Sequence, residues 1–258
     1  MSALSNAVAV LRLFSVERPA LSVTDVSRLL GMPKSSASRL LKAMLGAGLL
    51  ANADDKPRYR VGPLFFEIAR LHGSGSRLMD LADAALAAIC RQTGHTGYVS
   101  VLDGADVLVL RVHPGTQTLR VVTPLGSRAP AYATANGRML LARLDGEAVR
   151  ALHPAPLAPR SGRSPQTIDE LLNCLRQARS DGWCEAIDEA VPGVGSVAVS
   201  VADAENTDML AFCLSFPAHM VSEAERRELA GTLIGVAERI AAQVGDRFLT
   251  QARTRRAA

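Results

Sequence analysis

The feature that most constrains the fold is a pair of short helical patterns joined by a glycine turn near the start of the chain. Ser22 and Asp25 have the spacing of a capping box, in which each side chain binds a free backbone amide at a helix start. Apolar residues follow at helical intervals until Gly31, which permits the sharp turn that ends a helix. Pro33 then opens a second helix, because proline suits a first helical position. Two helices around such a turn are typical of a helix-turn-helix.

Further elements extend this pattern on both sides. A preceding helix of about three turns is predicted from apolar residues at helical spacing, and it should stop before Pro19. Those apolar residues are Leu4, Val8, Leu11 and Phe14. After the helix pair, residues 49–51 and 58–61 have the character of two strands around a polar turn at 52–57. Two strands that follow a recognition helix predict a winged helix-turn-helix.

The predicted recognition helix has two chemically different faces. At about 100° per residue, one arc is apolar and collects Pro33, Ala37, Leu40, Leu41 and Met44. The opposite arc has hydroxyls and cations without an acid, namely Ser35, Ser38, Arg39 and Lys42, with Lys34 on its flank. Such groups donate to phosphate oxygens and to guanine O6 and N7, which favours a place in a DNA major groove. The alternative is a plain three-helix domain whose cationic face is only solvated.

The predicted wing adds two more cations. Arg58 and Arg60 alternate to one face of the returning strand, from which they are predicted to reach phosphate or the minor groove. Residues 1–75 contain ten Lys or Arg and five acids, a balance of +5, whereas residues 76–258 contain 19 and 20, a balance of −1. A basic segment on a near-neutral body predicts a polyanion partner for that segment alone.

Composition limits the class of the protein. The 258 residues are 48% hydrophobic and 21% charged, which is enough for two folded domains. No run approaches the roughly 20 uninterrupted apolar residues of a membrane span, and the amphipathic N-terminus does not resemble a signal peptide. We therefore expect a cytoplasmic protein without a membrane partner. The four cysteines lie far apart, without metal-ligand spacing, and are predicted to be small buried hydrophobes: Cys90, Cys174, Cys184 and Cys213.

The rest of the chain is predicted to form an α+β domain. Glycine and serine at 73–77 predict a linker between a DNA-binding domain at 1–72 and a second domain at 78–258. Helical periodicity is found at 78–89, 134–144, 167–180 and 223–244. Strand-like runs lie at 98–102, 107–111, 119–123, 183–187, 196–201 and 210–215, the first two around the hairpin signal at 103–104. Strands grouped between helices indicate a mostly antiparallel sheet.

An enzyme is the competing class. The chain lacks the GxSxG elbow, the GxxxxGK[ST] phosphate loop, HExxH, and a GxGxxG motif that opens a helix after a strand. Its five histidines are scattered, and His95 is the one in a polar, loop-like setting, where lone histidines seldom form sites. We therefore predict no catalytic residue, metal or cofactor. An adaptor that binds only other proteins does not account for the cationic helix face.

Residues 22–64 resemble the DNA-binding domain of the IclR family of regulators. The match is carried by LGMPKSSASRLLKAMLGAGLL followed by RYRVGP, in the order and spacing of the family. The resemblance implies that DNA is contacted by Lys34, Ser35, Ser36, Ser38 and Arg39. Residues 132–143, 179–202 and 210–218 resemble the effector-binding domain of the same family, which implies a GAF-like fold.

The same resemblance implies a ligand pocket between the sheet and the loops of that domain. Its residues would be Ala129, Ala135, Asn136, Val194, Ser196, Cys213 and Ser215. Free N–H groups at the helix start around Asn136 suit a carboxylate, and Ser196, Cys213 and Ser215 would be neutral donors. Ordinary packing is the alternative for each residue. Family members often have two adjacent acids where Ala186 and Ile187 stand here, which leaves the identity of the effector open.

Together these observations predict a transcription regulator, a repressor or an activator, that binds double-stranded operator DNA as a homodimer or homotetramer. A small organic acid would shift the chain between arrangements that match the operator spacing and arrangements that do not.

Overall fold

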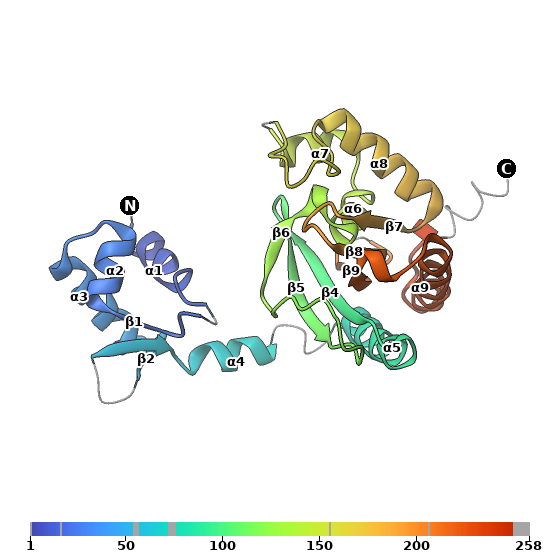
Figure 1. The fold of residues 1–258 in the computed structure, drawn as a ribbon. Helices are drawn as coiled ribbons and strands as arrows, with labels where there is room; N and C mark the ends of the chain where they lie inside the picture. Colours follow the sequence, from blue (N-terminus) through green and yellow to red (C-terminus); the bar gives the residue numbers. More distant parts are fainter. Residues whose placement is uncertain are drawn as a thin grey trace. The chain divides into compact units, whose positions relative to one another are not determined.

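The chain divides between Gly75 and Ser76 into two units, each with its own hydrophobic core (Figure 1). The computed structural model describes residues 2–15, 17–53, 57–71, 76–154, 156–205 and 207–249. The predicted linker at 73–77 falls largely outside these residues, since only Ser76 and Arg77 of it are described. The domain limits at 72 and 78 therefore stay a prediction.

The first unit combines helices with a small antiparallel sheet. Its elements are α1 (Ala3–Leu11), β1 (Ala20–Ser22), α2 (Val23–Leu30), α3 (Lys34–Gly46), β2 (Leu50–Ala53), β3 (Arg58–Val61) and α4 (Leu64–Leu71). The strands are ordered β1-β3-β2. Val10, Leu21, Val26 and Leu41 are fully buried and join the first three helices to the sheet. Three helices followed by the β2–β3 hairpin are the predicted winged helix-turn-helix.

Both arms of the predicted capping box are present at the start of α2. The Asp25 N–H donates to Ser22 Oγ over 3.2 Å, and the Ser22 N–H donates to Asp25 Oδ2 over 2.9 Å. Gly31 follows α2 with a φ of 63°, the left-handed conformation that glycine adopts without strain at a helix end. The start and the end of α2 therefore depend on Ser22, Asp25 and Gly31, the residues from which they were predicted.

Two helix limits in the first unit differ from the prediction. α1 ends at Leu11, and Phe14 lies beyond it, because the chain turns at Ser15, whose Oγ accepts the Arg18 N–H. Pro33 precedes the first residue of α3 instead of being that residue, since its ψ of 141° is extended. The sequence pattern also does not predict β1 or α4, which are only three and eight residues long.

The second unit is built on a six-stranded sheet in which every neighbouring pair is antiparallel. Its strands are β4 (Thr96–Asp103), β5 (Asp106–His113), β6 (Arg128–Pro130), β7 (Cys184–Ile187), β8 (Val194–Ala202) and β9 (Met209–Pro217), in the order β6-β5-β4-β9-β8-β7. Its helices are α5 (Arg77–Thr93), α6 (Ala135–Leu141), α7 (Gly146–Leu152), α8 (Ile168–Asp181) and α9 (Glu223–Val244). The predicted α+β fold with an antiparallel sheet is confirmed.

Side chains of the sheet alternate between two separate cores. Val197 and Val199 of β8 pack in the core of α5 and α9, whereas Ala198 packs in the core of α6 and α8. Figure 1 shows α5 and α9 on one side of the sheet and α6, α7 and α8 on the other. Because a strand has a period of two residues, Ser196 and Ser200 lie on the α6 side with Ala198.

Residues 119–123 do not form the predicted strand. The outer edge of β5 pairs with β6 instead, and the Gly126 N–H donates to the Val109 carbonyl over 2.9 Å. Residues 119–123 therefore belong to a long irregular loop between β5 and β6. The predicted helix at 134–144 is also shorter, because α6 ends at Leu141, and the sequence pattern does not predict α7.

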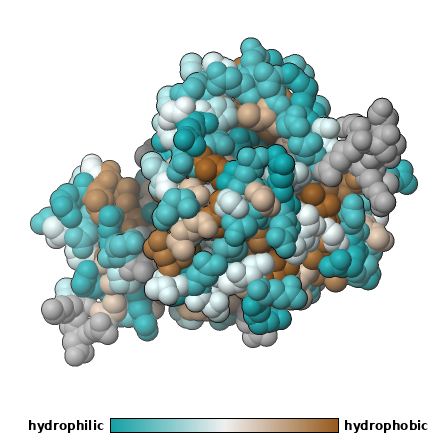
Figure 2. Space-filling model, turned by 45° about the vertical axis from the view of Figure 1, so that its right-hand side comes forward, coloured by the Kyte–Doolittle hydropathy of each residue, from teal (hydrophilic) through white to brown (hydrophobic). Residues whose placement is uncertain are grey.

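The surface of the molecule mixes both kinds of side chain. In Figure 2 hydrophobic side chains reach the surface as separate patches between hydrophilic ones. Leu119, Val122 and Leu125 of the β5–β6 loop are among the exposed apolar residues. No helix in the described part of the chain is both long and apolar enough to cross a bilayer.

Candidate DNA-binding face and ligand cavity

The two faces of α3 are as different in the structure as in the sequence. Ala37, Leu41 and Met44 are buried against the first unit. The predicted DNA contacts lie on the other side, where Lys34, Ser35, Arg39 and Lys42 are exposed and Ser36 and Ser38 are half-buried. Among the described residues of the first unit, one ion pair is present, between Arg28 and Asp25 of α2, 3.8 Å apart. The cations of α3 are thus uncompensated and available to a polyanion.

The wing presents its arginines differently. Arg58 and Arg60 are both exposed on β3, but Arg58 Nη2 donates to the Ala20 carbonyl of β1 over 3.0 Å. Arg58 therefore holds the sheet together in addition to any contact with DNA. Residues 54–56, half of the predicted turn at 52–57, lie outside the described residues.

Ser27 is a positioning residue that the sequence pattern does not single out. Its Oγ donates to the Met32 carbonyl over 2.7 Å, across the turn that joins α2 to α3. The Met32 N–H also donates to the Ser27 carbonyl over 3.1 Å. The two bonds fix the angle at which the exposed face of α3 leaves the turn. An i, i+5 contact of this kind has no distinctive spacing that could predict it.

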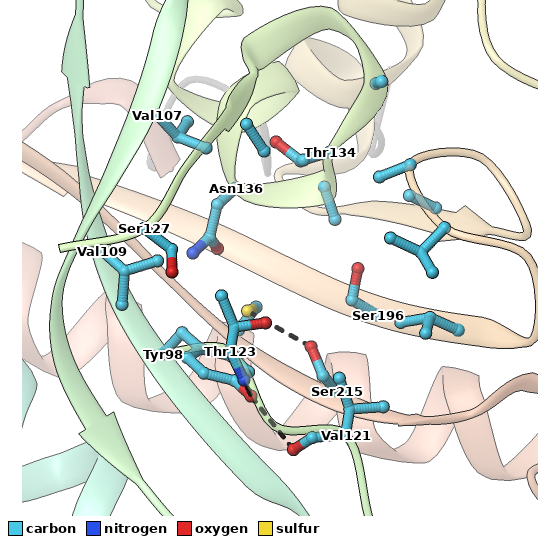
Figure 3. A pocket seen from close by; sticks show the side chains of 18 of the residues that line it. Tyr98, Val107, Val109, Val121, Thr123, Ser127, Thr134, Asn136, Ser196 and Ser215 are labelled. Carbon is cyan, nitrogen blue, oxygen red and sulfur yellow. Dashed lines mark hydrogen bonds between the residues drawn. The ribbon is translucent and has the colours of Figure 1, made fainter. Parts of the chain in front are cut away.

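A cavity of about 660 Å³ lies on the α6 side of the sheet in the second unit (Figure 3). The start of α6, strands β4, β5, β8 and β9, and the loops β5–β6 and β7–β8 all contribute to its walls. All seven residues implied by the family resemblance border it: Ala129, Ala135, Asn136, Val194, Ser196, Cys213 and Ser215. These seven residues, from four separate segments of the chain, are therefore brought to one cavity.

The sheet supplies a floor of small polar side chains. Ser196 on β8 and Ser215 on β9 are directly opposite one another, and Tyr98 on β4 is opposite Cys213 on β9. Cys213 Sγ lies 3.9 Å from Ser215 Oγ. Burial raises the pKa of the Cys213 thiol to about 12, so the thiol stays protonated. The floor is thus neutral and offers hydroxyl and thiol hydrogen-bonding groups.

Asn136 brings an unsatisfied amide to the cavity. Its Nδ2 donates to Ser100 Oγ over 3.0 Å, while its Oδ1 has no partner among the described residues although the side chain is buried. Buried polar groups are normally hydrogen-bonded, so this amide can bind a further group. Gly137 fixes its position, because a side chain there would place Cβ 2.2 Å from the Ala131 carbonyl oxygen.

The charges around the cavity are of one sign. Arg120, Arg128 and Arg160 border it, and none of its described lining residues is Asp or Glu. Arg128 is paired with Asp103, whereas Arg120 and Arg160 are exposed and have no ion-pair partner among the described residues. The sequence pattern did not select these arginines, because two of them lie in irregular segments without a motif.

The four cysteines and His95, the other candidates for a ligand or metal contact, have packing roles. Cys90 and Cys213 are buried and Cys174 and Cys184 are half-buried, all as free thiols. His95 packs against the Phe216 ring, 5.6 Å between centroids. The described residues contain no group of three or more His, Cys, Asp or Glu side chains placed to hold a metal ion.

Comparison with known proteins identifies the family. Residues 74–242 match the model of the bacterial transcriptional regulator IclR C-terminal domain, and residues 3–54 match the IclR helix-turn-helix domain. The HTH-type transcriptional regulator Rv1719 of Mycobacterium tuberculosis is 31% identical over 90% of this chain and 88% of its own. The p-hydroxybenzoate hydroxylase transcriptional activator of Acinetobacter baylyi is 28% identical over 83% of this chain and 81% of its own.

A solved structure has the same fold. An IclR homologue from Microbacterium hydrocarbonoxydans, crystallised with 4-hydroxybenzoate, superposes with a TM-score of 0.79 at 23% identity. The alignment covers 93% of this chain and all of that one. The two matching family models cover parts of both units. The first unit has the helix-turn-helix, and the second has the α+β fold with an antiparallel sheet. This chain belongs to the IclR family of bacterial transcription regulators, which are DNA-binding proteins and not enzymes.

Proposed function

We propose that the cavity of the second unit binds a small organic acid and that its occupancy sets the affinity of the first unit for operator DNA. The observation that carries this proposal is the lining of the cavity, which has three arginines at its border and no acid among the described residues. An anionic ligand gains from the uncompensated positive charge of Arg120 and Arg160 at the border of the cavity, whereas a cation would be repelled. The Asn136 amide and the facing Ser196 and Ser215 hydroxyls then supply neutral hydrogen bonds inside.

An aromatic acid is the class that best fits the walls. Tyr98, Val107 and Val109 give one side of the cavity an aromatic and apolar surface, as is usual in small-molecule sites. One relative is named as the p-hydroxybenzoate hydroxylase transcriptional activator, and one structural neighbour was crystallised with 4-hydroxybenzoate. These names favour 4-hydroxybenzoate as the first compound to test. They support the class of ligand and not its identity.

The two units would have separate roles. Residues 1–72 would bind DNA through the exposed face of α3 and the wing, and residues 78–258 would bind the acid and join copies of the chain in the cytoplasm. Helix-turn-helix proteins bind as dimers to half-sites separated by whole helical turns. A ligand that binds one arrangement of the dimer more tightly shifts the population toward it, and the coupling is reciprocal.

The test combines ligand binding with DNA binding in the full chain. A duplex operator is first selected from a random pool with the purified protein. Thermal unfolding is then followed with 4-hydroxybenzoate and with 4-hydroxybenzamide, which has the same shape without the charge. A ligand at 100 times its dissociation constant stabilises the fold by about 2.7 kcal/mol, so a clear shift is expected for the acid alone. Equal shifts for both compounds, or operator affinity that ignores the acid, would contradict the proposal.

A further inference from the structure

The β5–β6 loop forms one wall of the cavity but has few attachments to the rest of the second unit. All of residues 119–123 border the cavity. Leu119, Val122 and Leu125 are 53%, 70% and 65% exposed, so their burial contributes little to fixing the loop. The loop therefore needs other contacts to keep its shape as a wall.

Backbone hydrogen bonds anchor the loop at its two ends. The Thr116 N–H donates to the Gly94 carbonyl over 2.9 Å, and the Gly126 N–H donates to the Val109 carbonyl over 2.9 Å. Between these anchors, among the described residues, the hydrogen bonds that the rest of the unit makes to the backbone of residues 118–123 all involve one side chain, that of Tyr98. The Ser127 N–H donates to the Pro124 carbonyl over 3.1 Å, within the loop itself.

Tyr98 bridges two backbone groups of the loop (Figure 3). Its hydroxyl accepts the Thr123 N–H over 2.8 Å and donates to the Val121 carbonyl over 3.0 Å. Its ring is buried on β4, between Val112 of β5 and Cys213 of β9 in the sheet register, so the sheet holds the hydroxyl in place. Burial also raises the pKa of the phenol, which keeps the proton that it donates.

We infer that the Tyr98 hydroxyl is the positioning group that holds residues 119–123 as a wall of the cavity, and that it thereby sets how tightly and how selectively an aromatic acid is bound. The inference rests on the proposed function for its ligand. Its physical basis is that one hydroxyl satisfies both a carbonyl and an N–H. Removing it leaves two backbone groups without a partner, which favours conformations in which the loop leaves the cavity for water.

The test uses Tyr98→Phe in the full chain, with Tyr132→Phe as a matched control. The Tyr132 hydroxyl also donates to a backbone carbonyl, that of Ala158, but Tyr132 does not border the cavity. In the absence of ligand, amide hydrogen exchange at Thr123 should become on the order of tenfold faster in Tyr98→Phe and stay unchanged in Tyr132→Phe. Equal exchange rates at Thr123 in the two variants would overturn the assignment.

Ligand binding gives a second readout that a purely structural role would not change. The affinity for 4-hydroxybenzoate should fall on the order of tenfold in Tyr98→Phe, with a melting temperature close to that of Tyr132→Phe. The preference for 4-hydroxybenzoate over the bulkier 6-hydroxy-2-naphthoate should also decrease, because the released wall yields to the larger ring. Unchanged affinity and preference would overturn the role in selectivity.

The two proposals fail in different ways. A parent chain that does not bind 4-hydroxybenzoate contradicts the choice of this acid as the ligand of the cavity. Faster exchange at Thr123 in Tyr98→Phe alone still supports the positioning role of the hydroxyl.

Discussion

Arg138 on α6 lies 2.8 Å from a carboxylate oxygen of Glu189 in the loop between β7 and β8, and the two side chains are only 5% and 12% exposed. Arg138 also donates to the Glu185 carbonyl over 2.6 Å. Ala190 and Gly193 of the same loop border the cavity. The ion pair therefore fixes a second wall of the cavity to α6, whose first residues, Ala135 and Asn136, also border the cavity.

Breaking this pair should destabilise the second unit strongly. Glu189→Leu leaves a buried guanidinium without its charge partner, so the free energy of unfolding should fall by about 3–5 kcal/mol. The exposed pair of Arg150 and Asp169 is a control, and Asp169→Leu should cost less than about 1 kcal/mol. Urea denaturation measures both. The double variant Arg138→Met with Glu189→Leu should lose less free energy of unfolding than the sum of the losses in the two single variants. A loss equal to that sum would show that the two side chains are not coupled.

Recognition of DNA should depend on the exposed cations of α3. Arg39→Ala or Lys42→Ala should weaken binding to the selected operator by about 1–3 kcal/mol where the side chain reaches a base, and by less where it meets only phosphate. Arg176→Ala on α8, an exposed arginine in the second unit, is the control. Titrations at several salt concentrations separate the two cases, and sedimentation should show the parental oligomer. Parental operator affinity in both α3 variants would refute this surface.

The cavity can be filled from within. Asn136→Trp should abolish the thermal shift caused by 4-hydroxybenzoate while DNA binding persists, because the indole occupies the ligand space. Asn173→Trp makes the same exchange at an exposed position of α8 and should respond like the parent. Since Asn136 is buried, Ser196→Phe provides an independent block from β8. A parental thermal shift in both cavity variants would place the ligand elsewhere.

The half-buried His95 should make the fold sensitive to mild acid. Burial lowers the pKa of His95, and the Glu225 carboxylate opposes this more weakly. The fold thus favours the neutral ring, so its contribution is fully present above about pH 6.5 and is lost as the pH falls through the lowered pKa. His95→Leu should therefore lose less stability than the parent between pH 7 and pH 5. His219→Leu, at an exposed position, is the control, and a pH profile of His95→Leu identical to that of the parent would contradict this reading.

The second unit should be separable from DNA binding. A fragment that begins at Ser76 contains a complete core and a net charge of −1, against +5 for residues 1–75. Release of counterions from DNA needs many cations, so this fragment should fold and bind the acid without affinity for duplex DNA. Fluorescence anisotropy with the selected operator measures this. Duplex binding equal to that of the full chain would move the DNA site into the second unit.

The elements that the sequence predicted well are those specified by local chemistry. The capping box at Ser22 and Asp25 and the left-handed Gly31 depend on residues only a few positions apart, and they occur where the pattern indicates. The limits of α9 are those expected from its periodicity, and the structure adds a capping box at Ser222. Such features are nearly independent of the rest of the fold, which is why a single sequence predicts them.

The features that escaped prediction are set by distant partners. Alternation at 119–123 is typical of a strand, but the edge of β5 that it would join is taken by β6. The bridge from Tyr98 to Thr123 and the pair of Arg138 with Glu189 link residues 25 and 51 positions apart. The seven residues at the cavity came from family resemblance, since alternation alone does not distinguish a cavity floor from a packed core.

The two-residue alternation of β8 and β9 has a consequence for how this protein can change over evolutionary time. Small side chains face the α6 side of the sheet, namely those of Ser196, Ala198, Cys213 and Ser215. Val197 and Leu214 pack on the other side, in the core of α5 and α9. An exchange on the first face alters the volume and polarity of the ligand space, and leaves the packing beneath α5 and α9 untouched. If the cavity binds the proposed acid, descendants can acquire new effectors by single substitutions on one face of the sheet, while the core on the other face maintains stability.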